Sequence, residues 1–142
     1  MKNILLITTI IFSCLTGFSQ ANDKDWILYQ SIEGVEIYTL EVDCRSESVP
    51  AQKAIIVKIV NNNEYSVKVD WDLSVWYNNE KLTNNVKPGE NHYSINFNSK
   101  QTIEGNCDEP TGAFYIFKDF ITYVSPTKLT RFELENIRIT KI

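Results

Sequence analysis

Histidine, methionine and cysteine are scarce in this chain, and their scarcity excludes several kinds of chemistry. The 142 residues include one histidine, one methionine and three cysteines. A catalytic Ser-His-Asp or Cys-His arrangement would have to use His92, and no serine stands in a Gly-x-Ser-x-Gly context. The motifs His-Glu-x-x-His, Cys-x-x-Cys, Gly-x-Gly-x-x-Gly and the Walker loop are also absent. We therefore predict no catalytic residue, no metal site and no cofactor.

Long apolar runs are absent too, and the one short run lies at the start of the chain. Lys2 precedes an apolar stretch over residues 4–15, about a dozen residues, whereas a membrane-spanning helix needs about 18 or more. Small residues at 17 and 19 follow it, in the positions that a signal peptidase recognises. The pattern predicts a secretory signal peptide over residues 1–19, cleaved before Gln20, and no transmembrane segment in the mature chain.

Lipid attachment at Cys14 is an alternative fate for this leader. Small residues usually precede a lipidated cysteine, but the bulky Phe12 stands two positions before Cys14. Export to the periplasm or the medium without a lipid anchor is therefore the favoured prediction.

Basic side chains are fewer than acidic ones once the leader is removed. Residues 20–142 carry 13 basic and 18 acidic side chains, a net charge near −5. Nucleic acids and anionic membranes require a concentrated positive surface, so neither is expected as a partner. A chain of this length is enough for one domain with its own core, and it contains no repeat or linker that would divide it.

Two cysteines, Cys44 and Cys107, remain after cleavage. In an exported chain the simplest use of such a pair is a structural disulfide. A redox or metal role is the alternative, but neither cysteine belongs to a Cys-x-x-Cys motif or has a nearby histidine.

Apolar and polar residues alternate along most of the mature chain, with turn residues between the alternating stretches. This period of two is typical of strands that are buried on one face. Residues 35–44, 66–77 and 91–100 alternate in this way. Residues 53–61 are rich in β-branched residues, which indicates a strand near the middle of a sheet, and residues 26–30, 113–120 and 129–142 supply further strands. In the last stretch the apolar residues change parity near Asn136, which indicates a β-bulge or a change of sheet. We expect an all-β fold, an antiparallel β-sandwich of about seven or eight strands.

Four segments carry a resemblance to known proteins. They are GVEIYTLEVDC, KIVNNNEYSVKVDWDLSVWYNNE, EGNC and FELENIRIT. Their order resembles small exported bacterial proteins with an immunoglobulin-like or fibronectin-like sandwich, over nearly all of the mature chain. The resemblance implies a fold but no activity. In antibody domains the disulfide joins the two sheets beside a buried tryptophan, whereas here Trp71 follows Cys44 by 27 residues. We therefore expect the bridge to Cys107 to clamp one end of the sandwich.

The stretch SVKVDWDLSVWYNN, residues 66–79, raises the question of a site. By parity Trp71 belongs to the apolar row that faces the core, while Asp70, Asp72 and Trp76 belong to the other row. The two aspartates are expected on a solvated strand face. Trp76 is the candidate for contact with a partner, unless residues 119–127 cover it.

These features predict an exported bacterial envelope protein that acts as a binding or protein-interaction module. Its partner would be a protein or a glycan of the envelope. The alternative is a small secreted hydrolase or metal-dependent enzyme, which would need convergent polar groups in a deep pocket.

Overall fold

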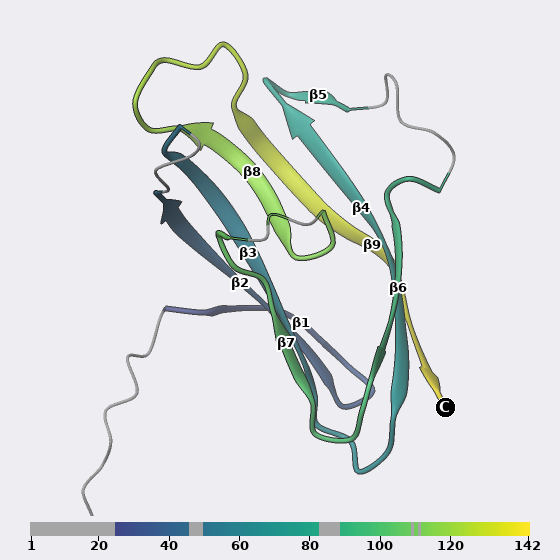
Figure 1. Cartoon of the computed structure of the whole chain (residues 1–142). Helices are drawn as coiled ribbons and strands as arrows, with labels where there is room; N and C mark the ends of the chain where they lie inside the picture. The colour runs from purple at the N-terminus through teal and green to yellow at the C-terminus, as the bar shows by residue number, and fades with distance from the viewer. Residues whose placement is uncertain (1–24, 46–49, 83–88, 109, 111) are drawn as a thin grey trace, which may run out of the picture.

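A computed structural model describes residues 25–45, 50–82, 89–108, 110 and 112–142 of the chain (Figure 1). The expected signal peptide, residues 1–19, and Cys14 lie outside these ranges. Within them the chain forms nine strands and no helix. None of the described residues form a helix that is long and apolar enough to cross a membrane.

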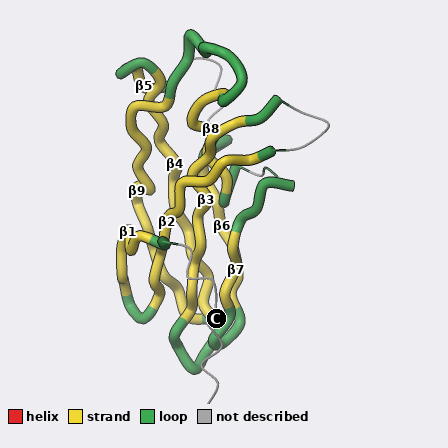
Figure 2. The backbone as a smooth tube through the Cα atoms, turned by 90° about the vertical axis from the view of Figure 1, so that its left-hand side faces the viewer, coloured by secondary structure: helices red, strands yellow, loops and turns green. Residues whose placement is uncertain are grey.

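The strands form two antiparallel sheets. The first contains β1 (Ile27–Ile32), β2 (Val35–Cys44), β3 (Gln52–Asn61), β7 (Thr102–Glu104) and β8 (Tyr115–Phe120). The second contains β4 (Val67–Tyr77), β5 (Glu80–Lys81), β6 (His92–Phe97) and β9 (Leu129–Lys141). In the first sheet β7 and β8 share one edge of β3, and β2 pairs with the other edge (Figure 2). In the second sheet β4 lies between β9 on one side and β6 and β5 on the other.

The inner faces of the two sheets share one apolar cluster. Its buried members are Val35, Ile37, Ile55, Val57, Ile59, Val67, Val69, Trp71, Val75, Phe97, Phe114, Ile116 and Leu134. Trp71 is only 1% exposed, and its ring centroid lies 5.5 Å from that of Tyr93 and 6.0 Å from that of Phe114. The prediction that Trp71 belongs to the core is confirmed.

A β-bulge interrupts the pairing of β4 with β9, and it is the first of the two alternatives that the change of parity indicates. Asp70 pairs with Arg138 and Asp72 with Glu135, so two residues of β9 lie opposite one residue of β4. Asn136 has a φ of 53°, and asparagine is one of the few residues that adopt this left-handed conformation readily. Because the extra residue reverses the alternation, apolar residues on both sides of the bulge reach the core.

The asparagine-rich turn between β3 and β4 is organised by the buried side chain of Asn61. Its amide nitrogen donates hydrogen bonds of 2.9 Å to the carbonyl oxygens of Tyr65 and Asn98, and its Oδ1 accepts one from the backbone nitrogen of Asn63. Asn61 therefore ties its own turn to the turn that follows β6.

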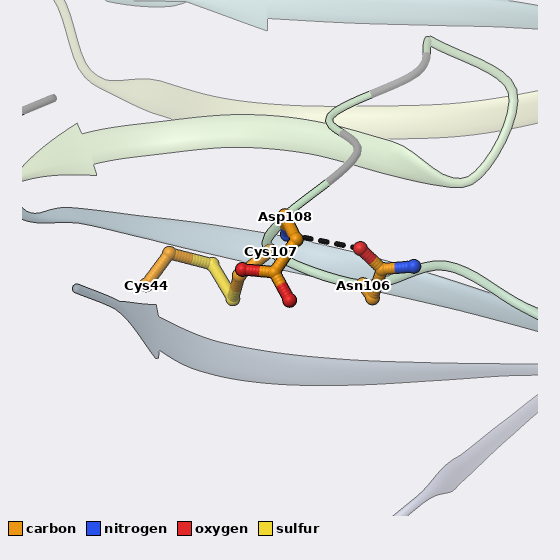
Figure 3. The surroundings of a disulfide bond; sticks show 4 residues. All are labelled: Cys44, Asn106, Cys107 and Asp108. Carbon is orange, nitrogen blue, oxygen red and sulfur yellow. Dashed lines mark hydrogen bonds between the residues drawn. A yellow bond between two sulfur atoms is a disulfide. The ribbon is translucent and has the colours of Figure 1, made fainter. Parts of the chain in front are cut away.

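Cys44 and Cys107 form a disulfide, with a Cα–Cα distance of 5.4 Å (Figure 3). Cys44 ends β2, whereas Cys107 lies between β7 and β8, which pair with the opposite edge of β3. The bridge therefore crosses β3 within the first sheet and does not join the two sheets. It belongs to a second apolar cluster that includes Ala54, Ile56 and Tyr115.

We expect the substitution Cys44→Ala to lower the free energy of unfolding. The bridge closes a loop with a sequence separation of 63, for which chain entropy gives about 4 kcal/mol as an upper figure. Urea midpoints of the oxidised protein and of the variant measure the difference. The double variant Cys44→Ala/Cys107→Ala is the control for effects of a free thiol and should lose a similar amount. Equal midpoints in all three proteins would contradict a structural role.

Candidate functional site

The outer face of the second sheet is polar along its whole length. The outward row of β4 consists of Lys68, Asp70, Asp72, Ser74 and Trp76. Their partners on the neighbouring strands are His92, Ser94 and Asn96 of β6, Lys81 of β5, and Arg131, Glu133, Glu135, Arg138 and Thr140 of β9. We call this set the polar face. Trp76 is its one large apolar side chain, so it stands out as the contact candidate.

Trp76 is half-buried between charged neighbours. Its cross-strand partners are Lys81 and Arg131. Lys81 Nζ lies 5.0 Å from the ring centroid and Arg131 Cζ lies 4.6 Å from it, both within cation–π distance. The groups over the ring are thus strand neighbours. The loop at residues 119–127 is the alternative cover that the sequence suggests for Trp76. In that loop the ring of Tyr123 stacks on the ring of Phe120, with the centroids 4.5 Å apart.

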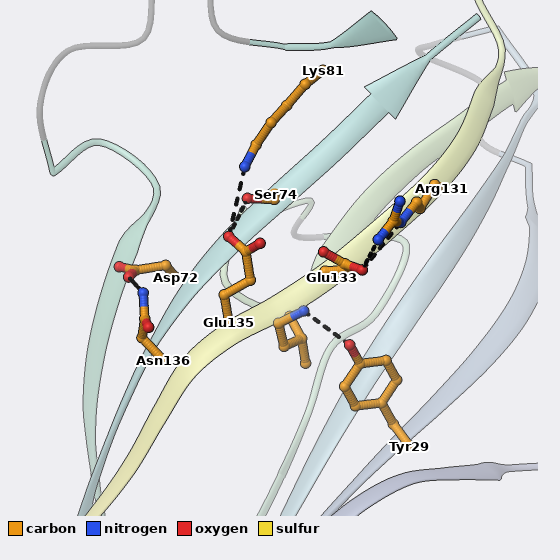
Figure 4. A network of polar contacts seen from close by, with 9 residues as sticks. Tyr29, Asp72, Ser74, Lys81, Arg131, Glu133, Glu135 and Asn136 are labelled. Carbon is orange, nitrogen blue, oxygen red and sulfur yellow. Dashed lines mark hydrogen bonds and ion pairs between the residues drawn. The ribbon is translucent and has the colours of Figure 1, made fainter. Parts of the chain in front are cut away.

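The two cations beside Trp76 are themselves held by acidic residues of β9 (Figure 4). Arg131 donates hydrogen bonds to Glu133, and Lys81 Nζ lies 3.7 Å from Glu135 Oε2. Ser74 donates a hydrogen bond of 2.6 Å to the same Glu135 oxygen. That hydrogen bond, together with the nearby Lys81, lowers the pKa of Glu135 below its ordinary value. The charged side chains around Trp76 are therefore held in place by ion pairs and hydrogen bonds with one another.

Asp70 is buried, although it belongs to the outward row. It is only 3% exposed, and its Oδ2 lies 3.6 Å from both Lys68 Nζ and Arg138 Nε. His92 Nε2 lies 3.9 Å from Oδ1. The expectation of a solvated carboxylate is therefore wrong for Asp70, because longer side chains from three strands cover it. A hydrogen bond from Ser94, followed by the nearby cations, lowers the pKa of Asp70.

Asp72 and His92 form a close pair beside Asp70. His92 Nδ1 lies 2.7 Å from Asp72 Oδ1, and Asn136 Nδ2 donates a hydrogen bond of 2.7 Å to Asp72 Oδ2. The hydrogen bond from Asn136, and then that with His92, lowers the pKa of Asp72. Both imidazole nitrogens face carboxylates, whereas a Ser-His-Asp arrangement needs one of them at the serine hydroxyl. In the described part of the chain no group of histidine, cysteine and acidic side chains is arranged to hold a metal ion.

A small hollow between the sheets has Arg131 in its wall. It has a volume of about 200 Å³ and is lined by Ile55, Lys118, Leu129, Thr130, Arg131 and Phe132. Arg131 therefore reaches both the hollow and the ring of Trp76. Ligand pockets usually measure 300 Å³ or more, so this hollow is small for one. No local sequence pattern predicts this hollow, because the residues that line it come from three strands, β3, β8 and β9.

Comparisons of the chain with protein-family models, curated proteins and solved structures gave no match. The properties of the site therefore rest on its own geometry.

We expect Asp70 to stabilise the fold at neutral pH and to lose this effect in acid. Its folded pKa is lowered, so its contribution is present above its ordinary value, about 3.9, and disappears as pH falls through the lower folded value. Asp70→Asn should reduce the free energy of unfolding at pH 7 by roughly 1–3 kcal/mol. Chemical denaturation between pH 2 and pH 7 measures both proteins, and their difference should shrink below about pH 4.

Ser94→Ala is the companion variant for this experiment. It removes the hydrogen bond that lowers the pKa of Asp70 most, so its stability should begin to fall at a higher pH than that of the parent protein. A difference between Asp70→Asn and the parent that is the same at every pH would show that the charge of Asp70 contributes nothing.

Proposed function

We propose that this chain is an exported binding module that contacts a protein of the bacterial envelope through Trp76 and the charged residues around it. The observation that carries the proposal is the position of Trp76, half-buried between Lys81 and Arg131 in a polar strand face. Tryptophan and arginine are the residues most enriched among those that dominate binding energy at protein interfaces. A pair of them that is already ordered would lose little conformational freedom on binding.

The cations beside Trp76 favour a protein over a glycan as partner. A sugar that stacks on tryptophan needs an open ring face, and Lys81 and Arg131 lie over this ring. The surface around Trp76 instead carries charges of both signs. It combines the edge of the indole with the guanidinium of Arg131 and the carboxylates of Glu133 and Glu135. Such a surface suits a partner with complementary charges.

Export and an immunoglobulin-like type of sandwich are parts of the same proposal. Two antiparallel sheets with a shared core support the sandwich type, together with the resemblance of the sequence. The disulfide between Cys44 and Cys107 fits an oxidising compartment, and the leader over residues 1–19 fits export to the periplasm or the medium.

The alternative of a small secreted hydrolase or metal-dependent enzyme has weaker support. The one histidine, His92, has both ring nitrogens directed at Asp70 and Asp72. The hollow of about 200 Å³ is lined by none of these three residues. Polar groups therefore do not converge in a pocket there, as hydrolysis would require.

Capture of envelope proteins on the immobilised mature protein tests the proposal. Trp76→Ala should weaken binding of the captured partner at least about tenfold, as expected when a central interface tryptophan is truncated. Tyr123→Ala is the matched control, because Tyr123 is an accessible aromatic residue, 49% exposed, that lies outside the polar face, in the loop after β8. A partner that is retained by Trp76→Ala and lost by Tyr123→Ala would place the contact surface elsewhere. Capture by neither the parent protein nor the control would contradict the proposal itself.

A further inference from the structure

Strand β9 pairs along one edge with β4. Among the strands of the described ranges, β4 is the only one that pairs with its 13 residues. The backbone nitrogen of Ile142 donates a hydrogen bond of 3.1 Å to the carbonyl oxygen of Ser66, next to β4. Because these directions alternate along a strand, the N–H and C=O groups of Ile137, Ile139 and Lys141 point away from β4.

The first half of this outer edge is closed by β1. The backbone nitrogen of Leu134 donates a hydrogen bond of 3.0 Å to the hydroxyl of Tyr29 (Figure 4). The ring of Tyr29 also stacks on Phe132, with the centroids 5.8 Å apart. In the described part of the chain no strand lies beside the second half, after the bulge at Asn136. The segment Ile137–Lys141 is thus a short open edge, a template for another strand.

We propose that this edge pairs with the same edge of a second copy of the chain, antiparallel and centred on Ile139. In this register Ile139 lies opposite Ile139 and Ile137 opposite Lys141, so every free N–H and C=O group of the segment finds a partner. On the outer face Arg138 lies opposite Thr140, and no like charges meet. Centring the pair on Arg138 would place two arginines opposite each other on the outer face.

The side chains along the edge suit this arrangement. Ile137 and Ile139, on the inner face of the strand, are partly buried against the core. Pairing would extend the inner apolar row across the two copies. An edge lysine usually deters strand addition, but Lys141 Nζ is held 4.3 Å from the ring centroid of Tyr65 in its own chain. The bulge at Asn136 limits the paired length, so the dimer should be reversible.

Sedimentation equilibrium and amide hydrogen exchange, each over a range of protein concentrations, test the proposal. We expect a monomer–dimer equilibrium in which exchange at Ile137, Ile139 and Lys141 slows as concentration rises. Exchange at Arg138 and Thr140, whose N–H groups face β4, should be slow at every concentration. A protein that stays monomeric up to millimolar concentration would overturn the proposal, as would a dimer without protection at these three amides.

Three variants locate the interface. Ile139→Pro removes an N–H that points away from β4, so the variant should fold but remain monomeric at concentrations where the parent dimerises. Thr140→Glu would lie opposite Arg138 of the second copy and should tighten the dimer several-fold, whereas Thr140→Lys should weaken it. Because Lys68 is opposite Thr140 in the same chain, denaturation of both variants is the control for altered stability. Equal dimer affinity of the two Thr140 variants would contradict this register.

Discussion

The alternation of side chains along β4 is the constraint on which the rest of the structure depends. β4 pairs on both edges, and its inner row, with Trp71 at the middle, packs against the first sheet. A shift of one residue in its pairing would bring Asp70 and Trp76 inward and Trp71 outward, so the buried tryptophan fixes the register. That register in turn places the polar row of β4 beside the charged residues of β9. Core and polar face are therefore two consequences of the same pattern.

Much of this architecture could be predicted from the sequence, because a single local pattern was enough to indicate each of several features. The period of two gives β2 as Val35–Cys44, and the change of apolar parity indicates the bulge at Asn136. The disulfide was predicted from the two cysteines that remain after the expected leader, and the structure contains it. Each of these predictions depends on local spacing or on composition. None of them requires knowledge of which strands are neighbours in space.

The features that escaped prediction depend on neighbours in space or on very short segments. Asp70 is buried because His92 from β6 and Arg138 from β9 lie against it. No local pattern in the sequence predicts that these three side chains are neighbours. β5 and β7 have two and three residues, too few to show an alternation. The cations over Trp76 likewise follow from the pairing of β4 with β5 and β9.

The measurement that tests this division of β4 most directly is a comparison of Trp71→Ala with Trp76→Ala in chemical denaturation. The two positions are five residues apart on opposite faces of one strand, so the chemical change is the same and the burial differs. Trp71→Ala should lower the free energy of unfolding by roughly 3–5 kcal/mol, because it leaves a large cavity in the core. Trp76→Ala should cost clearly less, since Trp76 is only half-buried and lies outside the core, between Lys81 and Arg131. Equal destabilisation, or a larger loss at Trp76, would contradict the account of β4 as a strand with one core face and one contact face.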